Sequence, residues 1–208
     1  MRWFRRNKKR PSIDGLTQAI EADPENPTHW IARAEWHYEL GDYEAALADY
    51  SQAITLNPDY SVDAYLGRGS CYWRLSAASD DPVAALACAR ADYHQVVVRD
   101  PGHHDGYLGL ALTYEALGHH DEALGHDDEA LVNFDQAVAL APHNADLYLN
   151  RGLFHEQLGD LDAAIADFER AVDILTTGGD KPYLQRVTRC LDRTRAARKA
   201  GGGGGERP

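Results

Sequence analysis

One short pattern recurs four times along the chain and constrains the fold more than any other feature. Two copies match closely: 45–50 reads Ala-Ala-Leu-Ala-Asp-Tyr and 163–168 reads Ala-Ala-Ile-Ala-Asp-Phe, each followed three residues later by Ala. Two weaker copies run over 89–101 and 130–142, and a helical segment with an early aromatic precedes each copy, at Trp30, Tyr65, Tyr107 and Tyr148. Self-similarity of this kind predicts stacked copies of one helix pair.

The pattern resembles the tetratricopeptide repeat, in which about 34 residues form two helices closed by proline. Residues 27–60 match it best, with Trp30, Ala34, Tyr50 and Pro58 at the family's positions. A small residue where two helices cross lets them approach to about 8–10 Å. The four copies place Ala34, Gly69, Ala111 and Gly152 there.

The resemblance covers residues 27–175 and implies an all-α fold, an α-solenoid of four helix-turn-helix repeats with a partial N-terminal helix and a C-terminal capping helix. We expect a basic, disordered arm (1–10), a half-repeat helix (11–26), repeat one (27–61), repeat two (62–103), repeat three (104–144), repeat four (145–178), a capping helix (180–199) and a flexible Gly-rich tail (200–208).

Two repeats depart from the family length. The second has roughly eight extra residues between Leu75 and Ala89, where Asp80-Asp81-Pro82 supplies a helix start, so its second helix is expected to be about two turns longer. The third contains a seven-residue duplication, 117–123 followed by 124–130. Seven residues are close to two helical turns, which favours a longer helix, whereas the glycines favour an enlarged loop.

The net charge of −12 is divided sharply along the chain. Residues 1–10 carry six basic and no acidic side chains, and residues 181–208 carry eight basic and two acidic ones. Residues 11–180 carry seven basic and thirty-one acidic side chains. Such a body repels nucleic acid and favours basic partners, whereas both ends attract anions.

The family resemblance implies a ligand groove on the concave face, lined by the first helix of each repeat. Carried over to this sequence, the groove residues are Ile31, Glu35, Tyr38, Glu39, Asp63, Leu66, Trp73, Asp105, Leu108, Leu112, Glu115, Asp146, Leu149, Asn150, Leu153 and Glu156. This apolar floor with acidic edges suits a basic, partly apolar peptide or helix, with Tyr38 and Trp73 as anchors.

Two other interpretations of these positions remain open. The leucines and isoleucine can pack against the next helix, and the acidic residues can be solvated surface groups. Family members that clamp an acidic chaperone tail use Lys, Arg and Asn in the groove. Here only Arg74 and Asn150 are of that kind, which disfavours such a ligand.

The basic arm suggests an alternative function. Trp3 and Phe4 lie among its six basic residues, a composition that suits the anionic inner surface of a membrane. The alternative is therefore a peripheral membrane adaptor. Docking of the arm onto the acidic body, or no specific role for it, are the other possibilities.

The sequence offers no catalytic motif, and we expect a non-catalytic scaffold without cofactor or metal. The histidines at 103, 104, 119, 120 and 126 have no family metal spacing and are expected at the surface. Cys71, Cys88 and Cys190 contain no Cys-x-x-Cys pair and are expected to be buried thiols. Without an apolar stretch of about 20 residues or a secretory signal, the protein is expected in the cytoplasm.

Overall fold

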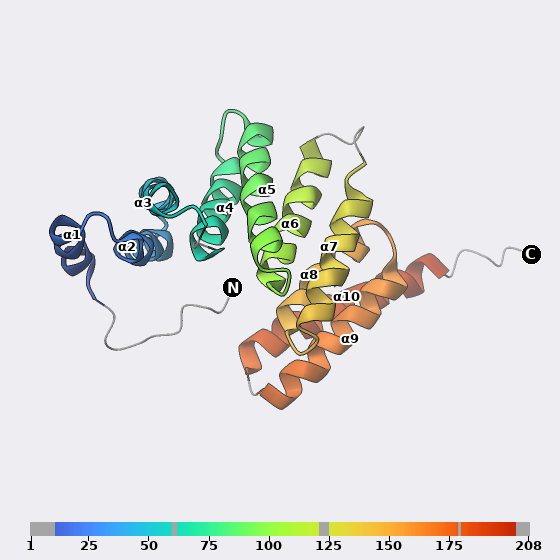
Figure 1. The fold of residues 1–208 in the computed structure, drawn as a ribbon. Coiled ribbons are helices and arrows are strands. Elements are labelled where there is room, and N and C mark those ends of the chain that lie inside the picture. Colours follow the sequence, from blue (N-terminus) through green and yellow to red (C-terminus); the bar gives the residue numbers. More distant parts are fainter. Residues whose placement is uncertain (1–10, 60–61, 121–124, 179, 203–208) are drawn as a thin grey trace, which may run out of the picture. The chain divides into compact units, whose positions relative to one another are not determined.

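The computed structural model describes residues 11–59, 62–120, 125–178 and 180–202, with only the backbone at His120. These ranges contain ten helices and no strand (Figure 1). The helices are α1 (Ile13–Ala22), α2 (Pro27–Leu40), α3 (Tyr43–Leu56), α4 (Val62–Ser76), α5 (Pro82–Arg99), α6 (His104–His120), α7 (Asp127–Leu140), α8 (Ala145–Gln157), α9 (Leu161–Gly178) and α10 (Lys181–Gly202). The basic arm, and with it the membrane alternative, lies outside the described residues.

Short polar side chains begin the helices. Asn26 accepts a hydrogen bond from the Thr28 N–H at 3.2 Å, and Pro27 occupies the first turn of α2, where its missing N–H costs no helical hydrogen bond. Gly41 ends α2 with φ +82°, a left-handed conformation that glycine adopts without strain. The next residue, Asp42, caps α3, so α2 and α3 are joined by a tight turn.

The chain forms two compact units, Met1–Asn133 and Phe134–Pro208, and the division lies within α7. In the first unit each helix from α1 to α6 packs against the next along the chain. In the second unit α8 packs against α9, and α9 against α10. Because the contacts join neighbours in sequence, each unit is built as a stack of helix hairpins.

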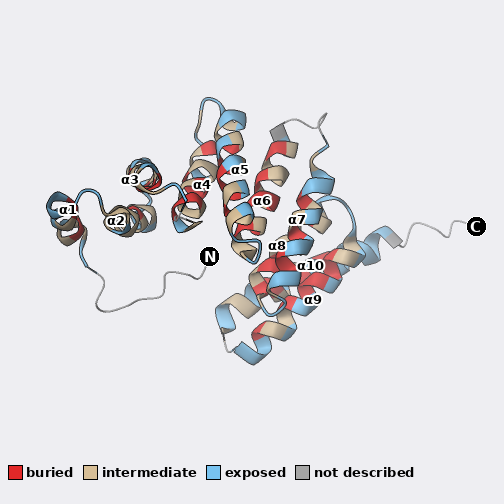
Figure 2. Cartoon of the chain, in the orientation of Figure 1, coloured by how far each residue is buried: buried red, intermediate tan, exposed pale blue. Residues whose placement is uncertain are grey.

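Aromatic rings pressed against glycines form the core of both units, and Figure 2 shows the buried residues where helices meet. The Tyr50 ring of α3 lies on Gly67 of α4 so closely that a Cβ at Gly67 would be 2.2 Å from Cζ of the ring. Tyr93 lies on Gly109 in the same way, and Phe168 lies on Gly152. These pairs bring successive helices together.

The two irregular repeats differ in how they accommodate their extra residues. In the second, the extra residues divide between a turn at 77–81 and α5, which has 18 residues against 14 in α3. Asp81 caps α5 at the predicted helix start, and the extension is about one turn rather than two because the turn at 77–81 takes up the other extra residues. In the third, α6 continues through His120 and α7 starts at Asp127, with Gly125 at φ +53° between them. The duplication therefore contributes to both helices and to their connection.

The last helix covers the end of the second unit. Val187, Leu191 and Thr194 of α10 are buried. Arg195 donates to Glu169 of α9 at 2.6 Å, and Arg198 donates to Asp162 of α9 at 2.6 Å. One apolar stripe flanked by ion pairs thus holds α10 in place.

The cysteines have three different environments. Cys71 is fully buried in the core of the first unit, and this burial raises the pKa of its thiol to about 12. Cys88 is exposed and Cys190 is half-buried. The prediction of buried thiols holds for Cys71 and is wrong for Cys88, because Cys88 lies on the outward side of α5.

Substituting Gly67 by alanine tests the ring–glycine contact. The added Cβ displaces the Tyr50 ring, which is only 2% exposed and has little room to move. We expect Gly67→Ala to lower the free energy of unfolding by roughly 1–3 kcal/mol, measured by urea titration with circular dichroism. The control is Gly118→Ala in α6, where the nearest atom to the new Cβ lies at 3.7 Å. There we expect stabilisation of about 0.5–1 kcal/mol, and equal stabilities of the two variants would contradict the packing argument.

Candidate functional site

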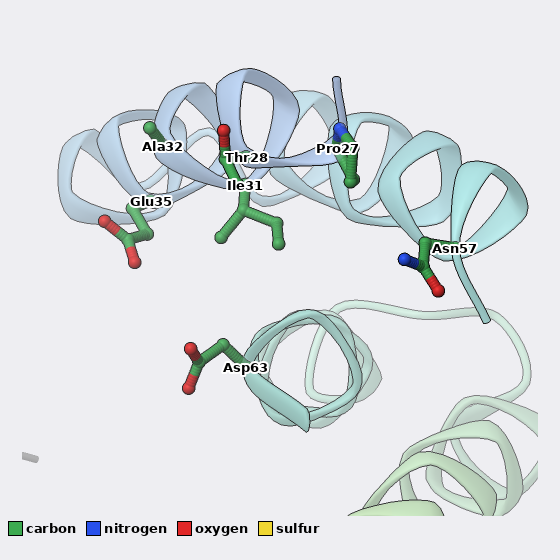
Figure 3. A pocket seen from close by; sticks show the side chains of 7 residues that line it. All are labelled: Pro27, Thr28, Ile31, Ala32, Glu35, Asn57 and Asp63. Atoms are coloured by element: carbon green, nitrogen blue, oxygen red, sulfur yellow. The ribbon is translucent and has the colours of Figure 1, made fainter. Parts of the chain in front are cut away.

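A hollow of about 240 Å³ lies between the beginnings of α2 and α4. Figure 3 shows Ile31 and Glu35 pointing from α2 toward α4, which carries Asp63. The complete lining is Pro27, Thr28, Ile31, Ala32, Glu35, Asn57 and Asp63. The hollow combines an apolar floor with two carboxyl side chains.

Three of the predicted groove residues, Ile31, Glu35 and Asp63, meet in this hollow. Ile31 and Glu35 are four residues apart and therefore share one face of α2. Asp63 lies in the first turn of α4 and is exposed. Asn57, the residue that caps the end of α3, completes the wall and was not among the predicted residues.

The two predicted anchors are held by contacts within the first unit. The Tyr38 ring packs edge-on against Tyr43, with centroids 5.2 Å apart, and its hydroxyl accepts a hydrogen bond from Arg74 at 3.5 Å. The Trp73 indole N–H donates to the Leu112 carbonyl at 3.3 Å. Both rings are half-buried, so each has a structural role whether or not it binds a ligand.

The other predicted groove residues have varied environments. Leu108 is 6% exposed and Leu149 is 4% exposed, which favours the packing interpretation for these two. Asn150 donates to the Asp146 carbonyl of its own helix at 2.6 Å, and Thr194 of α10 donates to Glu156 at 2.8 Å. Leu66, Leu112, Leu153, Asp105 and Glu115 are half-buried, and Glu39 is exposed. Burial raises the pKa of the Glu115 carboxyl, and nearby His119 opposes the shift in part.

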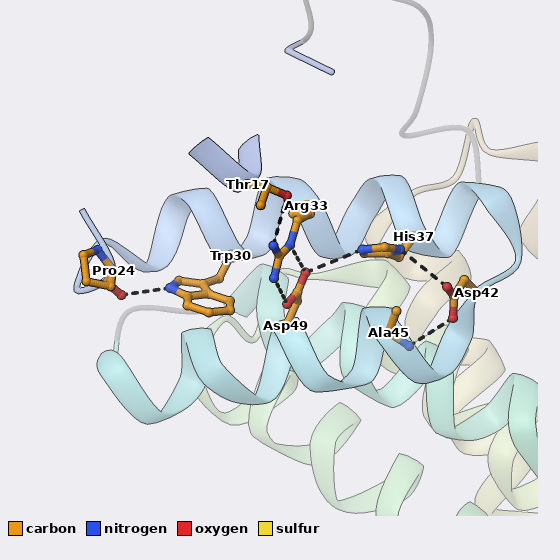
Figure 4. Close-up of polar contacts among 8 residues, drawn as sticks. All are labelled: Thr17, Pro24, Trp30, Arg33, His37, Asp42, Ala45 and Asp49. Atoms are coloured by element: carbon orange, nitrogen blue, oxygen red, sulfur yellow. Dashed lines mark hydrogen bonds and ion pairs between the residues drawn. The ribbon is translucent and has the colours of Figure 1, made fainter. Parts of the chain in front are cut away.

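A polar contact that was not predicted from the sequence recurs in three repeats. Arg33 of α2 donates two hydrogen bonds to the Asp49 carboxylate of α3, at 2.7 and 2.8 Å (Figure 4). Arg68 holds Asp92 at 2.8 and 2.7 Å, and Arg151 holds Asp167 at 2.9 and 2.6 Å. The sequence does contain a pattern that marks these pairs. In each of the three repeats, the arginine follows the early aromatic of the first helix by three residues, and the aspartate directly precedes the aromatic of the second helix.

Each arginine also reaches the helix before its own pair. Through its remaining guanidinium nitrogen, Arg33 donates to the Thr17 hydroxyl of α1 at 3.1 Å. Arg68 donates in the same way to the Ser51 hydroxyl of α3 at 3.5 Å. Arg151 does the same to Asp135 of α7 at 2.6 Å. One side chain thus ties three successive helices, which suits the planar fork of five N–H donors in arginine.

The third repeat replaces both partners. Leu110 stands where the other repeats have arginine, and Asn133 stands where they have aspartate. Leu110 is buried, and the Asn133 amide donates to the Glu129 carbonyl of its own helix. Because Leu110 and Asn133 replace both charged residues, neither an arginine nor an aspartate remains at this position without its partner.

Burial and pairing act against each other at Asp92. Burial raises the pKa of the Asp92 carboxyl, and the hydrogen bonds and charge of Arg68 lower it in part. The same hydrogen bonds raise the pKa of the Arg68 guanidinium. The carboxylate therefore depends on its arginine to remain charged in the core.

Family models match most of the folded part of the chain. Residues 36–76 match a model described as TPR repeat, and residues 86–134 and 125–178 match one described as Tetratricopeptide repeat. The chain belongs to the tetratricopeptide-repeat family, and its fold class is the all-α solenoid of that family. Proteins of this family are generally interaction scaffolds rather than catalysts.

Individual relatives match parts of the chain. It is 28% identical to human RNA polymerase II-associated protein 3 over 116 residues, which are 56% of this chain and 16% of that protein. It is 30% identical to serine/threonine-protein phosphatase T of Aspergillus oryzae over 100 residues, 48% of this chain and 19% of that protein. The chain thus matches less than a fifth of the length of either relative.

A solved structure with the same fold is TTC0263, a tetratricopeptide-repeat protein of Thermus thermophilus. Its TM-score is 0.72 with 20% identity, covering 86% of this chain and 88% of that one. The described residues also bear on two other classes of site. None of the described helices is long and apolar enough to cross a membrane. Across the same ranges, no three His, Cys, Asp or Glu side chains gather where a metal ion could bind.

Removing one partner of an Arg–Asp pair should destabilise the first unit. Arg68→Leu leaves the Asp92 carboxyl buried without its donor, and we expect the free energy of unfolding at pH 7 to fall by roughly 3 kcal/mol. The double variant Arg68→Leu with Asp92→Asn copies the third repeat and should lose less than the sum of the two single variants. Urea titration of the four proteins gives the coupling.

The pH dependence of Arg68→Leu provides the second readout. Without Arg68, the folded-state pKa of Asp92 rises further above its unfolded value of 3.8. Between these two values the folded state binds a proton that the unfolded state has lost, so stability increases as the pH falls through that window. The penalty relative to the unmodified protein should therefore shrink from pH 7 toward pH 4. A penalty that stays constant with pH would show that the lost contact is not electrostatic.

Proposed function

We propose that this protein is a non-catalytic scaffold that binds a basic, partly apolar segment of another protein, and that the hollow beside α2 and α4 is part of the contact. The observation that carries the proposal is the meeting of Ile31, Glu35 and Asp63 in one concave place. All three were expected to contact a ligand from their positions in the repeat.

The chemistry of the hollow supports a lysine or arginine side chain as its occupant. Such a side chain packs its methylene stem on apolar surface and keeps its charged head near carboxylates or water. Pro27, Ile31 and Ala32 supply the apolar surface, while Glu35 and Asp63 supply the carboxylates. The acidic body of the chain adds long-range attraction for a basic partner.

The size of the hollow supports a side chain rather than a cofactor. Sites for drug-sized molecules usually enclose about 300–1,000 Å³, and this hollow holds about 240 Å³. The recurring polar side chains of the fold, the Arg–Asp pairs, already satisfy one another between helices. We therefore include in the proposal that the protein has no catalytic activity. The cytoplasmic location expected from the sequence is also proposed.

Tyr38 and Trp73 remain part of the proposed surface, as a half-buried border rather than as free anchors. Their hydrogen bonds to Arg74 and Leu112 fix the ring positions before any ligand arrives. A rigid aromatic surface loses little conformational freedom on binding. Alanine at either position would also break a contact within the fold, so the charged residues of the hollow are better probes.

A pair of designed peptides tests the charge preference. One is a helical peptide with a leucine face and a lysine face, and the other has glutamate in place of every lysine. We expect the lysine peptide to bind the full chain in a fluorescence anisotropy titration and to weaken as salt is added, because the attraction is screened. The glutamate peptide should not bind.

Neutral substitutions locate the contact. Glu35→Gln with Asp63→Asn should weaken the lysine peptide about threefold to tenfold. The control, Glu44→Gln with Asp59→Asn, removes the same charge from exposed residues that do not line the hollow. Equal losses in the two double variants would mean that only net charge attracts the peptide, and the hollow would no longer be a candidate.

A further inference from the structure

The exposed side of the last helix carries a row of arginines. Val187, Leu191 and Thr194 of α10 are buried. Arg186 and Arg189 lie on the opposite side of the helix, Arg193 reaches Glu156 of α8, and all three are exposed. The second and third arginines of the row follow the first by three and seven residues. Of the charged residues of α10, seven are basic and one is acidic.

The exposed side of the first helix carries the opposite charge. Leu16 and Ile20 of α1 are buried, and Asp14, Gln18 and Glu21 on the other side are exposed. The second and third of these follow the first by four and seven residues. No residue in the described part of the chain forms an ion pair with Asp14 or Glu21.

We infer that these two surfaces bind each other between copies of the chain, with α10 of one copy lying antiparallel to α1 of the next. Counted from Glu21 toward the N-terminus, Gln18 and Asp14 lie three and seven residues away, the same spacing as the arginines of α10 counted from Arg186. Arg186 then faces Glu21, Arg189 faces Gln18 and Arg193 faces Asp14. Each row is about 10.5 Å long, from 1.5 Å of rise per residue. A parallel arrangement would leave the middle residues out of register.

The position of the two helices favours a second copy as the occupant. In a repeat array the first and last helices have a neighbour on one side only, and the other side stays exposed. Successive helices of this fold already pack antiparallel, so α1 of a second copy continues the same mode of packing. Arg193 also holds Glu156, yet its side chain is 62% exposed and has further N–H groups for another carboxylate.

The contact joins two different surfaces, so it can repeat from copy to copy unless the resulting chain closes into a ring. It does not involve the hollow beside α2 and α4, and it can hold or fail independently of the proposed function. Because the paired groups are exposed charges, the association is weak and depends on salt.

Sedimentation velocity of the full chain is the first test. At low salt the average mass should rise above the 23.0 kDa of one chain as the concentration increases, and it should return to one chain at high salt. A chain that stays monomeric at low salt over the whole concentration range overturns the inference.

Charge reversal then identifies the surfaces. Arg186→Glu with Arg189→Glu should weaken self-association roughly tenfold, and Gln18→Lys with Glu21→Lys, at the two facing positions of α1, should do the same. An equimolar mixture of these two variants pairs the reversed α10 with the reversed α1 and should restore association. The control is Lys181→Glu with Lys199→Glu, which makes the same charge change on α10 outside the row and should leave self-association intact.

Circular dichroism confirms that each variant keeps its helices before it is mixed. Restored mass in the mixture and an unaffected control support the α1–α10 contact. A mixture that remains monomeric, or a control that loses association as fully as the arginine variant, overturns it in favour of attraction by net charge.

Discussion

The contact between an aromatic ring and a residue without a side chain sets the spacing of the helices, and the other features of the fold depend on that spacing. Tyr50 on Gly67 and Tyr93 on Gly109 join successive repeats, and Phe168 on Gly152 joins the two helices of one repeat. Because the rings occupy the place of a Cβ, neighbouring helices approach closely and their outer side chains come within reach of one another. The Arg151–Asp167 pair lies between the same two helices as the Phe168–Gly152 contact.

The Arg–Asp pairs show how a helical array places charge at its interfaces without leaving it unsatisfied. Arg33, Arg68 and Arg151 each join three successive helices, so the pairs also fix the order in which helices pack. The third repeat solves the same problem by replacing both partners, with buried Leu110 and self-bonded Asn133. Replacing one partner alone would leave a buried charge, which costs more free energy than the pair contributes.

The repeat pattern predicts the helices and the crossing residues because small and aromatic side chains at helical spacing have few other ways to pack. It predicts only part of the candidate site. Ile31, Glu35 and Asp63 follow from their positions on the first helices, whereas Asn57 comes from the end of α3, which a face-by-face analysis omits. The burial of Leu108 and Leu149, and the bonds that hold Tyr38 and Trp73, depend on distances between helices that one sequence does not contain. The start of α5 at Asp81 and Pro82 was predicted, but the sequence did not show how many of the extra residues would form the turn before it.

The burial of Cys71 gives the first unit an internal reporter of its own fluctuations. With no exposed surface and a pKa of about 12, its thiol is both inaccessible and almost never ionised while the surrounding helices are closed. Exposed Cys88 in the same unit has no such protection. The ratio of their alkylation rates therefore measures how often α4 detaches from its neighbours, so the opening free energy of one hairpin can be followed without introducing a further cysteine.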